Sequence, residues 1–271
     1  MNRIPNVVLN LLNDYMYLWN ERLPHTLEGL YLHGSIVLDA YTNNSSDIDF
    51  IAITKNRLSN DEIVVMTEIH KIISNKYIWP EMDGSYIVWE DLGKDETFDH
   101  RSYPFYNGGE IGYSTQFNPV TWWLLKTKGI NILGQRPTDL NLKANKEDLV
   151  SYVLENMNSY WLNRVQRLEK SVEELLDIST KEEIDKEVEW TILGLLRQYY
   201  TVRERDIISK LGAGRYGLVH LPADWHTMIQ EAINIRENRG TSLFKSEEDR
   251  IDCMLRFSKY LIGFCNQLMS T

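Results

Sequence analysis

The chain has 271 residues, of which 43% are hydrophobic and 25% charged, as in a folded globular protein rather than a disordered or fibrous one. Its formal net charge of −10 disfavours nucleic acid and anionic lipid as partners and favours cationic molecules. The two cysteines, Cys253 and Cys265, lack zinc-ligand spacing, and neither a signal peptide nor a membrane span is predicted. We therefore expect a cytoplasmic protein with reduced thiols.

The first half of the chain alternates helical and extended patterns. Apolar residues at helical spacing predict helices, and short apolar runs bounded by turn residues predict strands. In chain order these are a helix over 6–22, strands over 29–35 and 47–54, a helix over 60–74, a strand over 84–89 and a helix over 119–128. Residues 97–120 are rich in Gly, Pro, Tyr and Asn and lack a clean period, which predicts a long functional loop.

The pattern changes near residue 148, after which helical spacing dominates. Apolar stripes over 149–177, 185–210, 223–238 and 246–269 predict helices that pack as a bundle. The sequence therefore predicts an α+β protein, with strands and helices in a domain over 1–148 and an all-α domain over 149–271.

Two short polar motifs stand where predicted strands end and begin. Gly34-Ser35 follows one strand, and Ser46-Asp47-Ile48-Asp49 opens the next. Because side chains alternate along a strand, Asp47 and Asp49 should share a face, where two carboxylates suit Mg²⁺ completed by substrate phosphates. Gly34 permits close approach of a phosphate, and Ser35 offers a hydroxyl and an amide. Either motif alone also fits an ordinary turn or a solvated strand edge.

Taken together, these motifs and their strands resemble the signature of the polymerase-β-like nucleotidyltransferase superfamily. That superfamily expects a third carboxylate on a neighbouring strand, and Asp83 stands directly before the strand over 84–89. The resemblance implies a mixed β-sheet with flanking helices in the first domain. It also implies that Asp47 and Asp49 bind Mg²⁺ and that Asp83 is catalytic, either as the base for the acceptor hydroxyl or as a ligand of a second metal ion.

The resemblance narrows to the aminoglycoside adenylyltransferases that modify spectinomycin and streptomycin, and it covers most of the chain. It rests on the acidic turn after Asp83, on Gly129–Gly134, and on the C-terminal segments Leu195–Tyr200, Lys210 and Leu221–Ala223. It implies ATP as the nucleotide, with the phosphates contacted by Gly34, Ser35, Ser46, Arg197 and Lys210. Local cations are needed because an acidic protein must offset the triphosphate charge at one site.

The chain departs from the family pattern in three places. Leu38-Asp39-Ala40 replaces the usual glycine after Gly-Ser, and the loop to Asp47 is one residue longer. Asp83 stands in place of a glutamate, so it needs a closer substrate hydroxyl or a bridging water. Ile178 and Glu183 occupy positions where streptomycin-modifying members carry tryptophan and aspartate, which favours spectinomycin.

Three residues are candidates for contacting the antibiotic. Glu183 and Glu187 belong to an acidic stretch over 181–189, which either meets a cationic substrate or is a solvated helix face. Tyr113 lies among aromatic residues that could wall a sugar pocket.

The sequence thus predicts Mg²⁺-dependent transfer of AMP from ATP to a hydroxyl of an aminoglycoside-type antibiotic, spectinomycin, streptomycin or both, with release of pyrophosphate and resistance as the result. The alternatives are a nucleotidyltransferase acting on a protein or another small molecule, and a catalytically silent nucleotide-binding module. An uncompensated cluster of carboxylates argues against the silent module, because it costs stability without a metal ion.

Overall fold

The computed structural model describes residues 4–43, 45–94, 102–114 and 117–269, and the chain divides into two compact units, Met1–Asn145 and Lys146–Thr271. The boundary predicted after residue 148 falls inside the first helix of the second unit, α5 (Lys146–Asn156). None of the helices in these described ranges is long and apolar enough to cross a membrane.

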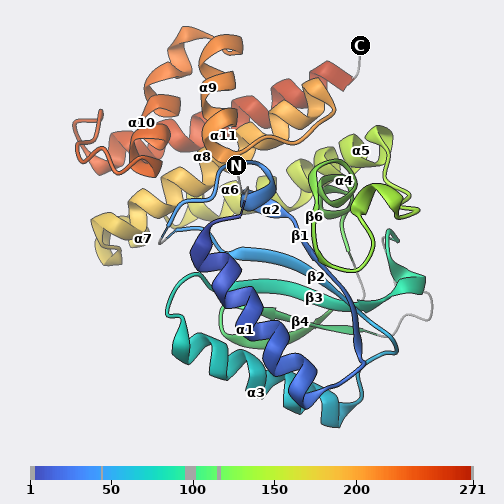
Figure 1. Ribbon diagram of the computed structural model, residues 1–271. Coiled ribbons are helices and arrows are strands. Elements are labelled where there is room, and N and C mark those ends of the chain that lie inside the picture. The colour runs from blue at the N-terminus through green and yellow to red at the C-terminus, as the bar shows by residue number, and fades with distance from the viewer. Residues whose placement is uncertain (1–3, 44, 95–101, 115–116, 270–271) are drawn as a thin grey trace. The chain divides into compact units, whose positions relative to one another are not determined.

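The first unit is built around one six-stranded sheet (Figure 1). Its strands lie in the order β5-β4-β3-β2-β1-β6. β2 and β3 are parallel and the other neighbouring pairs are antiparallel, so the sheet is mixed. In chain order the elements are α1 (Asn6–Arg22), β1 (Leu27–Leu32), α2 (Gly34–Val37), β2 (Ile48–Thr54), α3 (Asn60–Lys76), β3 (Met82–Val88), the 3-10 turn η1 (Trp89–Asp91), β4 (Tyr103–Asn107), β5 (Glu110–Ser114), α4 (Pro119–Lys128), β6 (Ile130–Leu133) and the 3-10 turn η2 (Pro137–Asp139).

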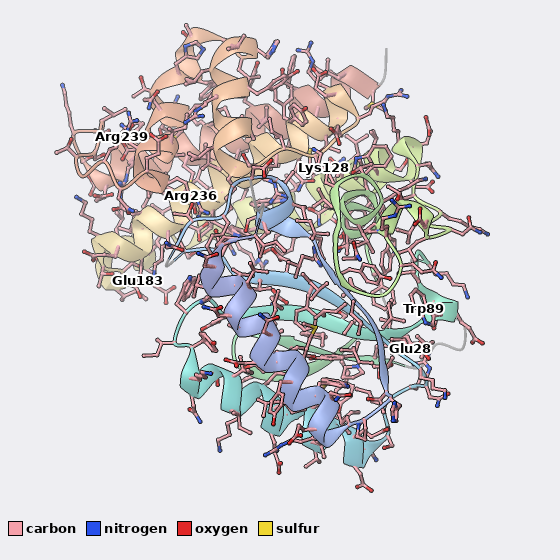
Figure 2. All side chains as sticks on the ribbon, viewed as in Figure 1. Glu28, Trp89, Lys128, Glu183, Arg236 and Arg239 are labelled. Atoms are coloured by element: carbon pink, nitrogen blue, oxygen red, sulfur yellow. The ribbon has the colours of Figure 1, made fainter. Side chains whose placement is uncertain are left out.

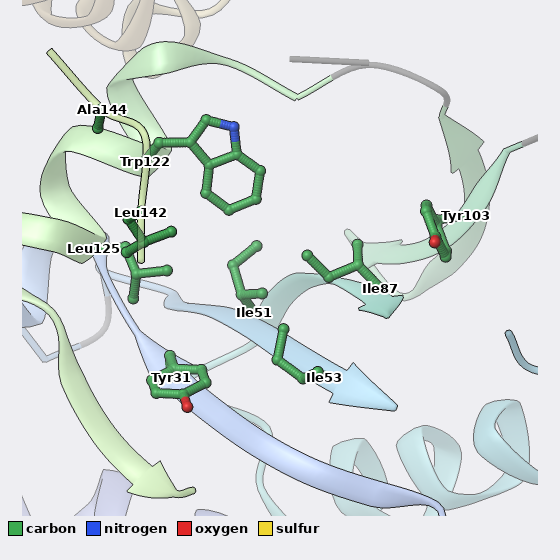
Figure 3. Packing of buried hydrophobic residues seen from close by; sticks show 9 residues of the cluster. All are labelled: Tyr31, Ile51, Ile53, Ile87, Tyr103, Trp122, Leu125, Leu142 and Ala144. Atoms are coloured by element: carbon green, nitrogen blue, oxygen red, sulfur yellow. The ribbon is translucent and has the colours of Figure 1, made fainter. Parts of the chain in front are cut away.

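Both faces of this sheet carry buried side chains, because side chains alternate between the two faces along each strand. On one face Phe50 and Tyr86 pack against Tyr15 of α1 and His70 of α3. The opposite face carries a second cluster around α4, shown in Figure 3, whose members are Tyr31, Ile51, Ile53, Ile87, Tyr103, Trp122, Leu125, Leu142 and Ala144. Asp49 shares this second face with Ile51 and Ile53, since it lies two residues before Ile51 on β2.

The prediction of a long loop over 97–120 is wrong for most of the described residues in this range. Tyr103–Asn107 and Glu110–Ser114 pair as an antiparallel hairpin, and β4 also pairs with β3. Gly108 and Gly109 form its turn with φ of +57° and +84°, the conformation that a two-residue hairpin turn requires. Residues 97–101 and 115–116 of the predicted loop lie outside the described residues.

The second unit contains only helices among its described residues, which confirms the predicted α+β class with an all-α C-terminal part. Its elements are α5 (Lys146–Asn156), the π-helical turn η3 (Met157–Trp161), α6 (Leu162–Lys170), α7 (Val172–Ile178), α8 (Lys181–Glu204), α9 (Lys210–His220), the 3-10 turn η4 (Ala223–Trp225), α10 (His226–Arg236) and α11 (Glu247–Met269). The helix predicted over 149–177 is therefore divided, and the one predicted over 185–210 ends at Glu204.

The helix α9 was not predicted as a separate element. Its three glycines give it a weak helix propensity. Two of them serve packing: a Cβ on Gly214 would lie 2.8 Å from Ile233, and one on Gly217 would lie 2.8 Å from Leu196. Glycine at these positions lets α9 approach α8 and α10 closely.

Candidate active site

Asp49 and Asp83 lie side by side on the two parallel central strands. They are register partners on β2 and β3, and the Oδ2 atom of Asp83 accepts a hydrogen bond of 2.7 Å from Asn107 Nδ2. Burial, with smaller contributions from the charges of Asp49 and Asp47, raises the pKa of Asp83 to about 6. The three carboxylates therefore act on one another, and Asp83 can exchange a proton close to neutral pH.

Gly34 lies directly against the Asp49 carboxylate. Its φ is +64°, and a Cβ built there would lie 1.7 Å from Asp49 Oδ2. The preceding backbone N–H, that of His33, donates to the Asp49 carbonyl oxygen at 3.0 Å. Burial lowers the pKa of His33 against the opposing effect of Asp49, so its ring stays neutral. The turn after β1 is thereby fixed beside the carboxylates.

The two serines of the motifs differ in their contacts. Ser35 Oγ is buried and has no hydrogen-bond partner among the described residues, so it can donate to a bound phosphate. Ser46 Oγ instead accepts a hydrogen bond of 3.0 Å from Thr42 N and holds the loop that leads to Asp47. Both hydroxyls therefore keep a proton that could be donated to a phosphate, and that of Ser46 also holds its loop in place.

The carboxylates offer a partial coordination shell for a cation. Asp47, exposed just before β2, and Asp49, half-buried within it, supply the hard oxygen ligands of Mg²⁺. In the described part of the chain no group of three or more His, Cys, Asp and Glu side chains is arranged to hold a metal ion. The donor set therefore fits an ion that takes its remaining ligands from water and substrate phosphates.

The second unit brings two cationic side chains, Lys210 and Arg236, to one carboxylate. Glu189 of α8 is buried, and its Oε1 lies 3.2 Å from Lys210 Nζ and 3.5 Å from an Arg236 guanidinium nitrogen. Arg197 of α8 donates from Nε to the carbonyl oxygen of Ile208 at 3.1 Å. Arg236, labelled in Figure 2, was not predicted from the sequence, because nothing in the spacing connects residue 236 with residue 210.

The predicted substrate residues have contacts of their own. Glu187 is mostly buried, pairs with Arg164 and accepts a hydrogen bond of 2.7 Å from Thr191 Oγ1, so it is not part of a solvated face. Glu183, labelled in Figure 2, is exposed and closes the capping box at the start of α8, where Thr180 N donates to its Oε2 at 2.7 Å. Tyr113 is 57% exposed on the edge strand β5.

The fold is that of a nucleotidyltransferase domain joined in sequence to a helical domain. Residues 164–260 match the family model described as aminoglycoside adenylyltransferase, C-terminal domain. Among solved structures, the chain is similar to the spectinomycin adenyltransferase AAD(9) from Enterococcus faecialis, crystallised with ATP and spectinomycin. The identity is 16% and the TM-score 0.64, over 94% of this chain and 99% of that one.

A comparison with curated protein sequences gives no significant match. The family model and the shared fold nevertheless agree with each other. They confirm the resemblance predicted from the sequence and indicate an enzyme of the aminoglycoside adenylyltransferase type.

Proposed function

We propose that this protein transfers AMP from ATP to a hydroxyl of an aminoglycoside-type antibiotic, spectinomycin, streptomycin or both, and thereby confers resistance. The observation that carries the proposal is the Asp49 and Asp83 pair beside Gly34 and Ser35. Support comes from the family model that residues 164–260 match and from the similar structure, which was crystallised with ATP and spectinomycin.

Asp83 is the candidate general base. A base with a pKa near the working pH is efficient, and a value of about 6 leaves Asp83 mostly ionised at neutral pH. The acceptor oxygen forms a bond to the α-phosphorus as the bond from that phosphorus to the oxygen of the β-phosphate breaks. The hydroxyl proton passes to Asp83, and pyrophosphate leaves with the electron pair of the broken bond. Asn107 fixes the orientation of the carboxyl group through its hydrogen bond.

The proposed nucleotide contacts are those that the family resemblance implies. Gly34 and Ser35 offer the backbone approach and the hydroxyl for a phosphate, and Arg197 and Lys210 offer positive charge. Asp47 and Asp49 would hold Mg²⁺, which when bound supplies neutralisation of the triphosphate charge. Each of these contacts places negative phosphate next to a donor or a cation.

A cationic antibiotic suits the charge of the chain. A net charge of −10 attracts polycations, and Glu183, Glu187 and Tyr113 are the proposed contacts. Because Arg164 already pairs with Glu187, an ammonium group of the substrate would have to share or replace that partner. Ile178 and Glu183 favour spectinomycin over streptomycin on the family pattern.

The test is pyrophosphate release from MgATP with spectinomycin, streptomycin and kanamycin in turn. We expect release that depends on the antibiotic, that stops when Mg²⁺ is chelated, and that is absent in Asp47→Ala. Release with none of the three, in a protein that still binds MgATP, would contradict the proposal. It would favour another acceptor or a silent nucleotide-binding module.

A further inference from the structure

The carboxylate of Glu189 lies where three helices bring cations together. Glu189 and Arg197 belong to α8, Lys210 is the first residue of α9, and Arg236 is the last residue of α10. Only 8% of Glu189 is exposed, and its Oε1 contacts both Lys210 and Arg236 at 3.2 Å and 3.5 Å. The carboxylate is therefore the common partner of cations that lie far apart in the sequence.

The charge balance of this cluster differs from that of the other buried ion-pair cluster in the same unit. Arg250 is one cation held by three carboxylates, with Asp185 at 2.6 Å, Glu231 at 3.0 Å and Glu247 at 2.5 Å. Such a cation needs no further anion. Glu189, by contrast, is one carboxylate contacted by two cations, Lys210 and Arg236, and its Oε1 is buried without a well-aligned hydrogen bond. The two cations are only partly exposed, so an anion such as phosphate bound beside them would balance the charge that Glu189 leaves unmatched.

From this arrangement we propose that Glu189 is a positioning residue, which holds Lys210 and Arg236 side by side to receive the phosphates of ATP. The inference rests on the proposed function and adds two residues to it, Glu189 and Arg236. Without the carboxylate, the two cations would repel each other and separate.

The effect of Glu189 should depend on pH because of Lys210. Burial lowers the pKa of Lys210, and the charges of Arg236 and Arg197 act in the same direction, whereas Glu189 opposes them. Replacing Glu189 by glutamine preserves size but removes this opposition, so the pKa of Lys210 falls further. At the lower pH the variant loses the contact that holds Lys210 and Arg236 together, which weakens phosphate binding. At high pH the variant loses the Lys210 charge first.

The experiment is calorimetric titration of the whole protein with MgATP at about pH 7 and about pH 9. For Glu189→Gln we expect weaker binding than in the wild type at both pH values, by about threefold at the lower pH and about tenfold at the higher, where the loss of the Lys210 charge adds to the loss of its alignment with Arg236. Glu189→Asp, which retains the charge, should restore most of the affinity at the higher pH. Glu182→Gln removes an exposed carboxylate from the first turn of the same helix and should bind like the wild type at both values.

The outcomes separate this inference from the proposed function. Wild-type protein that does not bind MgATP would overturn both. Wild-type binding with the same affinity for Glu189→Gln at both pH values would overturn the role of Glu189 alone. A weakening that is equal at both pH values, or that Glu189→Asp does not relieve, would also overturn it, because that pattern indicates only a disturbed fold.

Discussion

Asp49 and Asp83 are direct neighbours in register on adjacent parallel strands, and Gly34 leaves the space that the Asp49 carboxylate occupies. This relationship joins the two sequence motifs to a third carboxylate that follows them by more than thirty residues in the chain. It also explains the raised pKa of Asp83, because burial and the neighbouring aspartates both favour its neutral form.

The first prediction concerns the pH dependence of turnover. Since Asp83 must be ionised to accept a proton, kcat should rise with pH through about 6 and level off above it. Asp83→Asn should lower kcat by about 100-fold to 10,000-fold, the usual contribution of a general base. Steady-state rates between about pH 5 and pH 8 measure both effects. A rate that falls as the pH rises through this range would exclude Asp83 as the base.

The second prediction concerns the stability of the same variant. The folded-state pKa of Asp83 lies above its ordinary value of 3.8, so the ionised carboxylate destabilises the fold at neutral pH. This cost diminishes as the pH falls from above 6 towards 4, where the folded state binds the extra proton. Asp83→Asn should therefore raise the free energy of unfolding at pH 7.5 by about 1 kcal/mol, a value reduced for solvent screening.

Urea unfolding at pH 7.5 and pH 4.5 measures this effect. The stabilisation should shrink at the lower pH, since the carboxyl group of the wild type is then largely neutral. The asparagine can still accept the hydrogen bond from Asn107, so that contact is matched in the two proteins. Equal stability of variant and wild type at both pH values would contradict the raised pKa.

The third prediction concerns Gly34. Gly34→Ala should abolish MgATP binding and turnover, because its Cβ would lie 1.7 Å from Asp49 Oδ2 and φ is +64°. Gly108→Ala is the matched control, since it has a φ of +57° and no atom within 4 Å of a built Cβ. Both should lose about 1–2 kcal/mol of stability from the backbone conformation. Gly34→Ala should be destabilised by more than this amount and should also fail to bind MgATP, whereas Gly108→Ala should bind it normally.

The fourth prediction concerns Arg236. Arg236→Gln should raise the KM for ATP about tenfold, as the loss of one charge-assisted hydrogen bond to phosphate would do. The KM for the antibiotic should change little. Arg239→Gln is the control, because Arg239 is 64% exposed and pairs with Glu237 at 2.7 Å rather than with Glu189. Equal effects of the two variants on the KM for ATP would argue against Arg236 as a phosphate ligand.

The fifth prediction separates two roles of Glu183. Glu183→Ala removes the half of the capping box that Glu183 supplies, its hydrogen bonds with Thr180, and should lower the free energy of unfolding. Glu183→Gln retains an N3 side chain that can close the box and should stay near wild-type stability. If the Glu183 charge meets the antibiotic as proposed, both variants should raise the KM for spectinomycin. An unchanged KM in Glu183→Gln would leave only the capping role.

The sequence contains a local turn signal for the hairpin of β4 and β5, but neighbouring residues weaken the strand signal on either side of it. Gly108-Gly109 between extended runs is a hairpin turn signal. However, Pro104 and Gly112 lower the strand propensity on either side, and the pairing partner of β4 is distant in the chain. The bounds of α4, by contrast, follow from its own residues, because Asn118 caps it, Pro119 begins it and Gly129 follows it.

The sequence by itself determined the local elements and the chemistry. Periodicity predicted most helices and strands. Gly34, Ser35, Asp47 and Asp49 indicated phosphate and Mg²⁺ binding, because such residue types bind these ligands and here lie close together in the sequence. Only the tertiary structure decided which distant residues meet. The register of β2 with β3 sets the neighbour of Asp49, Arg164 approaches Glu187, and the packing of α9 and α10 on α8 brings Lys210 and Arg236 to Glu189. Such contacts depend on how whole helices and strands pack, and one sequence carries no spacing that reports them.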